Sequence, residues 1–105
     1  MLYEWRTYTI FDGKMPEAAH RFSVHTFSLF KKHGIQVRGF WEDCMGQNKI
    51  YYICEFQNME ERNVAFEAFG KDEEWQRVKA KSEENGKIVQ KIESVFMKDV
   101  PYWLG

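Results

Sequence analysis

The 105-residue sequence lacks the features that several classes of protein require. Its longest uninterrupted apolar run, residues 50–54, is far too short to cross a membrane. The first residues show no basic stretch followed by an apolar one, so no secretory signal is visible and we expect a cytoplasmic protein. Fifteen Lys and Arg nearly balance 16 Asp and Glu, for a formal net charge of −1. Because nucleic-acid binding needs a basic surplus, we expect no nucleic-acid partner. The shortness of the apolar runs predicts no membrane span.

Cysteine and histidine patterns are too sparse for a disulfide or a metal site. Cys44 and Cys54 flank a predicted turn and would lie ~13 Å apart along a hairpin, whereas a disulfide needs Cα atoms within about 7 Å. We expect both to be reduced and packed in strands. The histidines are His20, His25 and His33, and none has the four-residue spacing of a shared metal ligand. On an α-helix, His20 and His25 would lie about 140° apart.

No Gly-rich phosphate loop, nucleophile elbow or Cys–His pairing is present. The sequence therefore indicates no metal and no cofactor, and it identifies no catalytic residue.

Aromatic residues, in contrast, are abundant. Nine Phe, five Tyr and four Trp make up 17% of the chain. Each large ring buries much apolar surface, so this content indicates more buried surface than one small core provides. An oligomer interface or an apolar cavity would account for it.

Hydrophobic patterning and turn signals predict a β-α-β-β-α-β order in a single domain, residues 1–105. Asn58 and Asp72 are predicted helix caps, and the second helical region is expected to break between them. This pattern is typical of a ferredoxin-like α+β fold, with a four-stranded antiparallel sheet and helices on one face. The predicted segments are strands 2–11, 35–45, 49–56 and 91–100, helices 16–34, 58–69 and 73–84, and a non-strand tail 101–105.

Both faces of the predicted sheet carry apolar residues. In the first strand Trp5 and Phe11 alternate with Tyr8 and Ile10, and the last strand shows the same mixture. A half-exposed sheet would be apolar on one face only. Since the helices cover one face, we expect a second copy to cover the other, which predicts a homodimer with a partly enclosed cavity.

Four segments in order resemble the NIPSNAP family. Residues 3–9 resemble its Y-E-x-R-x-Y start, and Gly39-Phe40-Trp41 its G-x-W element; residues 52–56, followed by 60–62, are similar to its third strand and the next helix start. Residues 72–75 resemble its D-P-E-W segment, with Glu73 where proline is usual. The resemblance implies a dimeric α+β barrel and little about activity. Barrels of this class include cofactor-independent monooxygenases, haem-degrading enzymes and binding modules.

The first strand supplies the main ligand-cavity candidates. Glu4, Arg6 and Tyr8 have the same parity and should point to one face. If that face lines the dimer cavity, Arg6 would hold an anionic group while Glu4 or Tyr8 transfers a proton. The structural alternative is a Glu4–Arg6 ion pair that fixes the strand register or the interface. Glu55 is a weaker candidate for the wall of the same dimer cavity. The alternative interpretation is that its carboxylate faces solvent.

His25 and Trp41 complete the set of candidates. His25 lies between Phe22 and Leu29 and would face the sheet, as a helix histidine does in some haem-binding barrels; a partly buried structural histidine is the alternative. Trp41, like Trp75 and Trp103, would line an apolar site or belong to a core or interface. Arg77, Lys79 and Lys81 are interpreted as the solvated face of a mixed-charge helix.

Three functional hypotheses follow. The first is a homodimeric barrel that binds a small apolar or aromatic molecule in a cavity between the sheets. The second is a non-enzymatic interaction module, because the apolar tail 101–104 would seek a partner. The third, haem or monooxygenase chemistry, rests on analogy with the fold class.

Overall fold

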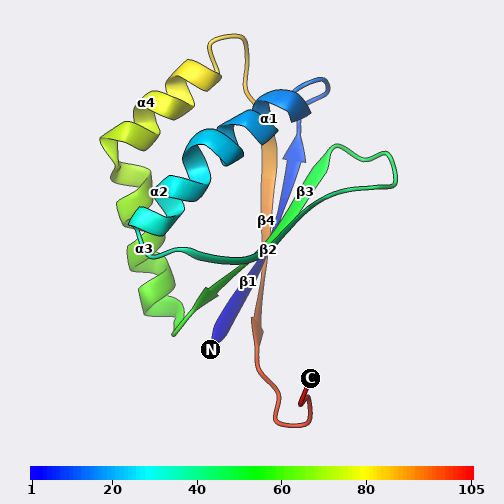
Figure 1. Cartoon of the computed structure of the whole chain (residues 1–105), viewed down its shortest axis with the longest axis vertical. Coiled ribbons are helices and arrows are strands. Elements are labelled where there is room, and N and C mark those ends of the chain that lie inside the picture. The colour runs from blue at the N-terminus through cyan, green and yellow to red at the C-terminus, as the bar shows by residue number, and fades with distance from the viewer.

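The computed structural model describes every residue of the chain, 1–105, and its elements follow the predicted order with each helical region divided (Figure 1). The elements are strand β1 (Leu2–Ile10), helix α1 (Met15–Arg21), the π-helical turn η1 (Phe22–Thr26), helix α2 (Phe27–Lys32), strands β2 (Gln36–Glu42) and β3 (Lys49–Phe56), helices α3 (Met59–Lys71) and α4 (Glu73–Ser82), and strand β4 (Val89–Lys98).

The four strands form one antiparallel sheet in the order β2-β3-β1-β4. The first strand of the chain therefore lies in the interior, between β3 and β4. At its centre Arg6 is opposite Tyr52 of β3 and Ser94 of β4. Side chains that are 46 and 88 residues from Arg6 in sequence thus become its neighbours on the sheet. The predicted ferredoxin-like α+β fold is confirmed.

All helices lie on one side of the sheet, and the core fills the space between (Figure 1). Along β1 every even-numbered residue from Glu4 onward is buried beneath the helices, whereas Trp5 is exposed on the other face. This alternation follows from the two-residue period of a strand. The buried hydrophobic core consists of Tyr8, Ile10, Ala18, Phe22, Leu29, Phe30, Ile35, Ile50, Tyr52, Cys54, Phe56, Ala65, Phe69 and Ile88.

The helix predicted over residues 16–34 is present as one unbroken helical segment over residues 15–32, but it is not α-helical throughout. Five residues, Phe22–Thr26, form a π-helical turn between α1 and α2. There the N–H of Phe27 donates to the carbonyl of Phe22, five residues back, and the Thr26 hydroxyl donates to the Arg21 carbonyl at 3.2 Å. In such turns each backbone hydrogen bond joins residues five apart, instead of the four apart that is usual in an α-helix. They change which side chains share a helix face.

The predicted break in the second helical region is confirmed, and so are its caps. Asn58 Oδ1 accepts a hydrogen bond from the Glu61 N–H at 2.8 Å, which starts α3. Asp72 Oδ1 accepts from the N–H groups of Glu74 and Trp75, which starts α4. Each carboxylate or amide oxygen satisfies donors that the first turn of a helix leaves free.

β3 has the predicted bounds and β1 ends one residue early, whereas β2 and β4 differ from the prediction by up to three residues. β2 ends at Glu42 rather than at residue 45. The reason is Asp43, whose carboxylate accepts hydrogen bonds from the N–H groups of Met45 and Gln47 and so folds the chain into a turn. β4 spans Val89–Lys98 rather than residues 91–100.

The face of the sheet away from the helices is rich in apolar and aromatic side chains. Trp5 and Trp41 stack there with ring centroids 6.4 Å apart, and Tyr51 packs against Trp5. Val95 on the edge strand β4 is 59% exposed on the same face. The predicted two-faced apolar sheet is therefore present, with one face left uncovered by the chain itself.

Both cysteines are free, but only Cys54 is packed in a strand. Cys44 lies exposed in the loop after β2, so the expectation that both would pack in strands was wrong. Cys44 was expected in a strand because the predicted strand 35–45 continues past the turn that Asp43 forms.

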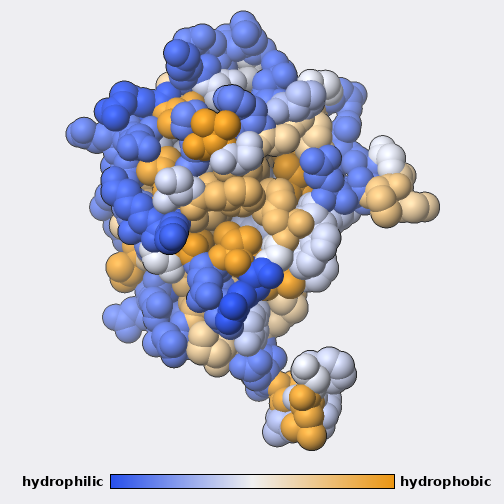
Figure 2. All heavy atoms as spheres, viewed as in Figure 1, coloured by the Kyte–Doolittle hydropathy of each residue, from blue (hydrophilic) through white to orange (hydrophobic).

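The last residues form an extended tail that leaves the body of the molecule (Figures 1 and 2). Tyr102, Trp103 and Leu104 are exposed, Leu104 at 94%. Figure 2 shows apolar side chains on this projection. None of the helices combines the length and the apolar character needed to cross a bilayer.

Candidate functional site

A buried polar network lies between the sheet and the helices, centred on Arg6. The Arg6 guanidinium donates from Nε to the Tyr52 hydroxyl at 2.8 Å, from Nη1 to Glu4 at 2.8 Å and from Nη2 to the Tyr8 hydroxyl at 3.3 Å. Tyr52 in turn donates to Tyr8 at 2.8 Å. Sequence parity predicted that Glu4, Arg6 and Tyr8 share one face, and the structure places them together on it.

Glu4 receives more hydrogen bonds than any other group of this network. Besides Arg6, it accepts two hydrogen bonds from Arg62 of α3, both at 2.9 Å, and one from the Ser94 hydroxyl at 2.7 Å. The two arginines share the aromatic ring of Phe66, which lies 4.4 Å from the Arg6 guanidinium carbon and 4.7 Å from that of Arg62. Two guanidinium groups thus face one carboxylate, and the cluster carries one net positive charge.

The surroundings shift the pKa values of these groups. Burial opposes ionisation of Glu4, but the hydrogen bonds from Arg62 and Ser94 and the charges of both arginines outweigh it, so the pKa of Glu4 is lowered. Burial raises the pKa of Tyr52 well above its usual value. Burial also raises the pKa of the Cys54 thiol, on the same strand, to about 12. Glu4 is therefore held ionised, whereas Tyr52 and Cys54 are held neutral.

The network is closed, since every buried side-chain nitrogen and oxygen has a hydrogen-bond partner. This favours the structural alternative for Glu4 and Arg6, an ion pair that fixes the central strand beneath the helices. The condition under which these residues would line a cavity between two sheets is not met in this structure. Their even-numbered positions point at the helices, and sequence could not tell which parity the helices cover because both parities are apolar.

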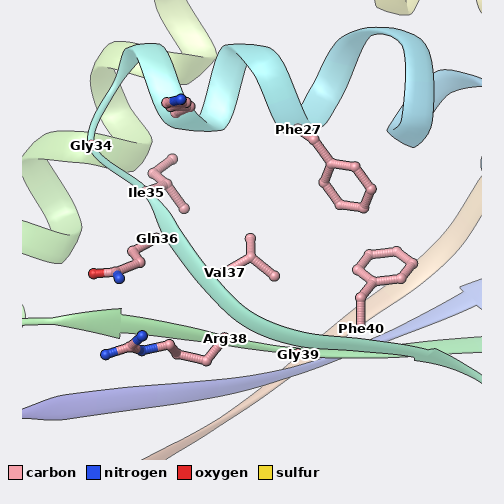
Figure 3. Close-up of a pocket in the computed structure, with 9 residues that line it drawn as sticks. Phe27, Gly34, Ile35, Gln36, Val37, Arg38, Gly39 and Phe40 are labelled. Carbon is pink, nitrogen blue, oxygen red and sulfur yellow. The ribbon is translucent and has the colours of Figure 1, made fainter.

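Beside the network, a groove of about 700 Å³ opens between α2 and the edge strand β2. Phe27 of α2 and Phe40 of β2 point toward one another at one end of it, with Val37 beside the pair (Figure 3). The two rings meet edge to face with centroids 5.0 Å apart. Figure 2 shows apolar side chains gathered in the middle of this side of the molecule and surrounded by hydrophilic ones. This groove is the structure's clearest place for an apolar ligand.

Two basic side chains line the same groove. Arg38 forms an ion pair with Glu55, with nitrogen–oxygen distances of 3.0 and 3.1 Å, and its side chain runs away from the ring pair (Figure 3). Lys31 has no carboxylate within ion-pair distance. Since the charge of Arg38 is balanced and that of Lys31 is not, the groove has one free positive charge at its rim.

The groove and the network touch through Phe40. Its ring stacks on that of Tyr52, with centroids 5.3 Å apart and planes 22° apart. The Tyr52 ring supports the apolar wall, while its hydroxyl belongs to the Arg6 network. The network thereby positions the wall of the groove from behind.

Trp41 and Glu55 lie on the opposite face of the sheet from Glu4. Trp41 stacks on Trp5 and crosses Gly39, where an added Cβ would clash with the indole. The predicted Gly39-Phe40-Trp41 element therefore divides between two faces, with Phe40 toward the helices. Glu55 is buried rather than solvent-facing, because Arg38 covers it.

His25 does not face the sheet. It is half-buried in a groove between η1 and α4, with its ring 6.1 Å from that of His20. The expectation that His25 looks toward the sheet failed because the π-helical turn rotates it away from the apolar face of Phe22 and Leu29.

Four residues of the network and the groove were not among the sequence-based candidates: Arg62, Tyr52, Phe27 and Lys31. Tyr52 had a usable signal, because its parity along β3 places it on one face with Cys54 and Ile50. Arg62 had none, since it lies 58 residues from Glu4 and reaches it only through packing of α3 on the sheet.

The model of the NIPSNAP family matches residues 3–103 of the chain. A NIPSNAP domain protein from Burkholderia xenovorans is 24% identical, with both chains covered at 100% and a TM-score of 0.83. A protein from Agrobacterium tumefaciens, Atu4242, is 22% identical over 97% of this chain and 96% of its own, with a TM-score of 0.84. Among curated proteins none matches this chain.

More distant solved structures share the fold. An antibiotic biosynthesis monooxygenase is 19% identical over 96% of this chain and 100% of its own, with a TM-score of 0.56. A mutant of MhuD, solved with two manganese protoporphyrin IX molecules per active site, is 15% identical over 100% of both chains, with a TM-score of 0.58. At these identities the likeness extends to the fold alone.

Proposed function

The chain belongs to the NIPSNAP family, and from this premise we propose that it is a homodimeric α+β barrel that binds a small apolar or aromatic molecule carrying an acidic group. The groove between α2 and β2 is the binding site. The observation that supports this assignment is the opposed ring pair Phe27 and Phe40 beside the unpaired cation Lys31.

The chemistry of the groove selects the ligand class. An aromatic or branched aliphatic body fits against Phe27, Val37 and Phe40, because offset and edge-to-face contacts with rings add to the burial of apolar surface. A carboxylate on that body would pair with Lys31. A neutral ligand would fill the same space and leave the lysine without a partner.

The homodimer is proposed from the uncovered sheet face. Trp5, Trp41 and Val95 present an apolar surface that the helices of the same chain do not reach. A second copy that packs its own open face against this one removes both surfaces from water and leaves the helix-side groove of each copy free.

Haem does not fit the residues that the sequence offered for it. His25, the proposed helix ligand, lies between η1 and α4, outside the groove that holds Phe27 and Phe40. The distant neighbours include a monooxygenase and a porphyrin-bound protein. No histidine lines the groove, so no haem ligand is assigned there, and at 19% and 15% identity the likeness to these two proteins extends to the fold alone.

An interaction module remains the second candidate, because the tail exposes Tyr102, Trp103 and Leu104. Deletion of residues 101–105 tests it. Loss of a bound protein partner with unchanged thermal melting favours the module, whereas a large fall in the melting temperature means that the tail packs on a second copy.

A titration with 2-naphthoate and its neutral counterpart 2-naphthamide tests the proposed ligand class. We expect 2-naphthoate to bind the more tightly, by about fivefold at low salt, which is the strength of an exposed ion pair. Lys31→Gln should remove that preference, while Lys71→Gln, which removes an exposed cation elsewhere, should keep it. Phe27→Ser should weaken both compounds by at least about tenfold. Equal affinities for the two compounds in the unaltered protein would refute an acid-specific groove.

A further inference from the structure

A second groove, of about 430 Å³, lies between the first helical region and α4, and basic side chains line it from both sides. His20 of α1 and His25 of η1 form one wall, and Arg77 and Lys81 of α4 form the other. No carboxylate lines it. We propose that this groove binds a tetrahedral oxyanion, a phosphate or sulfate group.

The π-helical turn creates the histidine wall. On a regular α-helix, residues five apart point about 140° away from each other. In η1 a backbone N–H bonds the carbonyl five residues back, and the ring of His25 lies with its centroid 6.1 Å from that of His20 in α1, the planes at 76°. Turns of this kind interrupt α-helices frequently at functional sites. Here the interruption has a definite result, since two imidazoles face one space.

A buried arginine fixes the two walls relative to each other. Arg21, 5% exposed, donates to the Ser82 hydroxyl at 3.1 Å and pairs with Glu83 at 3.2 Å, and its guanidinium carbon lies 5.2 Å from the centre of the Trp75 ring. These contacts tie α1 to both ends of α4. Arg21 therefore fixes the relative position of the two helices that carry the four basic groups; His20, Arg77 and Lys81 are exposed and His25 is half-buried.

The charges around the groove are unbalanced. Glu83 forms an ion pair with Arg21, and the Glu17 carboxylate lies 3.8 Å from the Lys14 ammonium nitrogen. Neither Arg77 nor Lys81 has a carboxylate within ion-pair distance, and the remaining α4-region carboxylates do not line the groove: Glu73, Glu74 and Glu84. An oxyanion would supply the missing negative charge.

Oxyanion geometry matches the donors. A guanidinium presents parallel N–H groups to a phosphate or sulfate, a lysine supplies a point charge, and a protonated imidazole adds a donor on each nitrogen. Sulfate is a dianion at every pH at which the protein would be studied and is therefore the appropriate probe.

The test is a sulfate titration of the whole protein at constant ionic strength, followed through the imidazole carbon–proton signals in NMR spectra. We expect the His20 and His25 signals to shift together and saturably, while His33, which pairs with Asp72 at 2.7 Å outside this groove, stays unmoved.

Two double variants with the same change in net charge separate a site from general electrostatics. Arg77→Gln with Lys81→Gln should weaken sulfate binding by about tenfold or more, whereas Lys79→Gln with Lys87→Gln, which removes two cations outside the groove, should change it less than about twofold. Equal weakening of sulfate binding by the two double variants would overturn the proposal. Histidine signals that shift without saturating as sulfate is added would do the same.

A phenyl phosphate titration shows whether the groove binds the phosphate group of an organic compound or a free oxyanion. Tighter binding of phenyl phosphate than of inorganic phosphate at the same pH assigns the groove to a phosphorylated organic compound. Equal binding assigns it to the free oxyanion. Binding of neither ion by the unaltered protein contradicts the site.

Discussion

The ring of Phe40 stacks on the ring of Tyr52, with centroids 5.3 Å apart and planes 22° apart. Through this contact one aromatic residue of the buried network supports the apolar wall of the groove. The Tyr52 ring packs from behind the wall, and its hydroxyl accepts from Arg6 and donates to Tyr8. Ring and hydroxyl therefore have separable roles, and substitutions at the two ends should have different effects.

Tyr52→Phe should lower the free energy of unfolding by about 1–3 kcal/mol, because Arg6 Nε and the Tyr8 hydroxyl each lose a buried partner. Binding of 2-naphthoate should change little, since the ring remains. The matched control is Tyr51→Phe, which removes a half-buried hydroxyl that bonds Asp43 on the other face and should cost less. Urea denaturation measures both, and equal losses would contradict the assigned network.

Glu4→Gln should lower the free energy of unfolding by roughly 3 kcal/mol at pH 7, because two arginines lose the carboxylate that they share. The lowered pKa of Glu4 determines how its contribution to the free energy of unfolding depends on pH. Its stabilising contribution is complete above the ordinary glutamate pKa of 4.5 and is lost as the pH falls through the lowered folded value.

The difference in unfolding free energy between the wild type and Glu4→Gln should therefore narrow between pH 5 and pH 2. Urea denaturation at several pH values in this range measures it. A difference that stays constant or widens as the pH falls would show that Glu4 is not ionised in the folded protein.

The two cysteines should differ in reactivity. Cys44 is exposed, whereas burial raises the pKa of Cys54 to about 12 and hides its sulfur. Iodoacetamide at pH 8 should add one group to the native protein and two after unfolding, as read by mass spectrometry. Cys44→Ser should accept none while folded, and a modified Cys54 in that variant would contradict the packing of β3.

The open sheet face should hold two copies together. Val95→Lys places a charge on that face and should give a monomer, whereas Ile92→Lys, on the same strand but the helix-facing side and 48% exposed, should leave a dimer. Sedimentation equilibrium measures the assembly, with circular dichroism to check folding. A wild-type monomer, or dissociation by both variants, would remove the homodimer from the account.

Much of the fold could be predicted because its signals are local. Asn58 and Asp72 cap their helices through oxygens that reach N–H groups two or three residues ahead, so the sequence alone contains both partners. The strand period likewise predicted that Glu4 and Arg6 share a face. Which face the helices cover was not predictable, because aromatic residues occupy both parities of β1.

The π-helical turn and the groove depend on contacts between distant segments. Nothing in the residues around His25 departs from an ordinary helical pattern, yet η1 turns that ring toward α4. The groove requires Phe27 and Phe40 to meet across a helix and a strand. Such pairings arise from tertiary packing, and the residue pattern of one segment does not predict which distant segment it will contact.

The most direct measurement is the location of bound 2-naphthoate, from nuclear Overhauser contacts between its ring protons and assigned side chains. The account predicts contacts to Phe27, Val37 and Phe40 in the groove beside α2. Contacts to Trp5 and Trp41 on the open sheet face instead would contradict the account and place the ligand between two sheets.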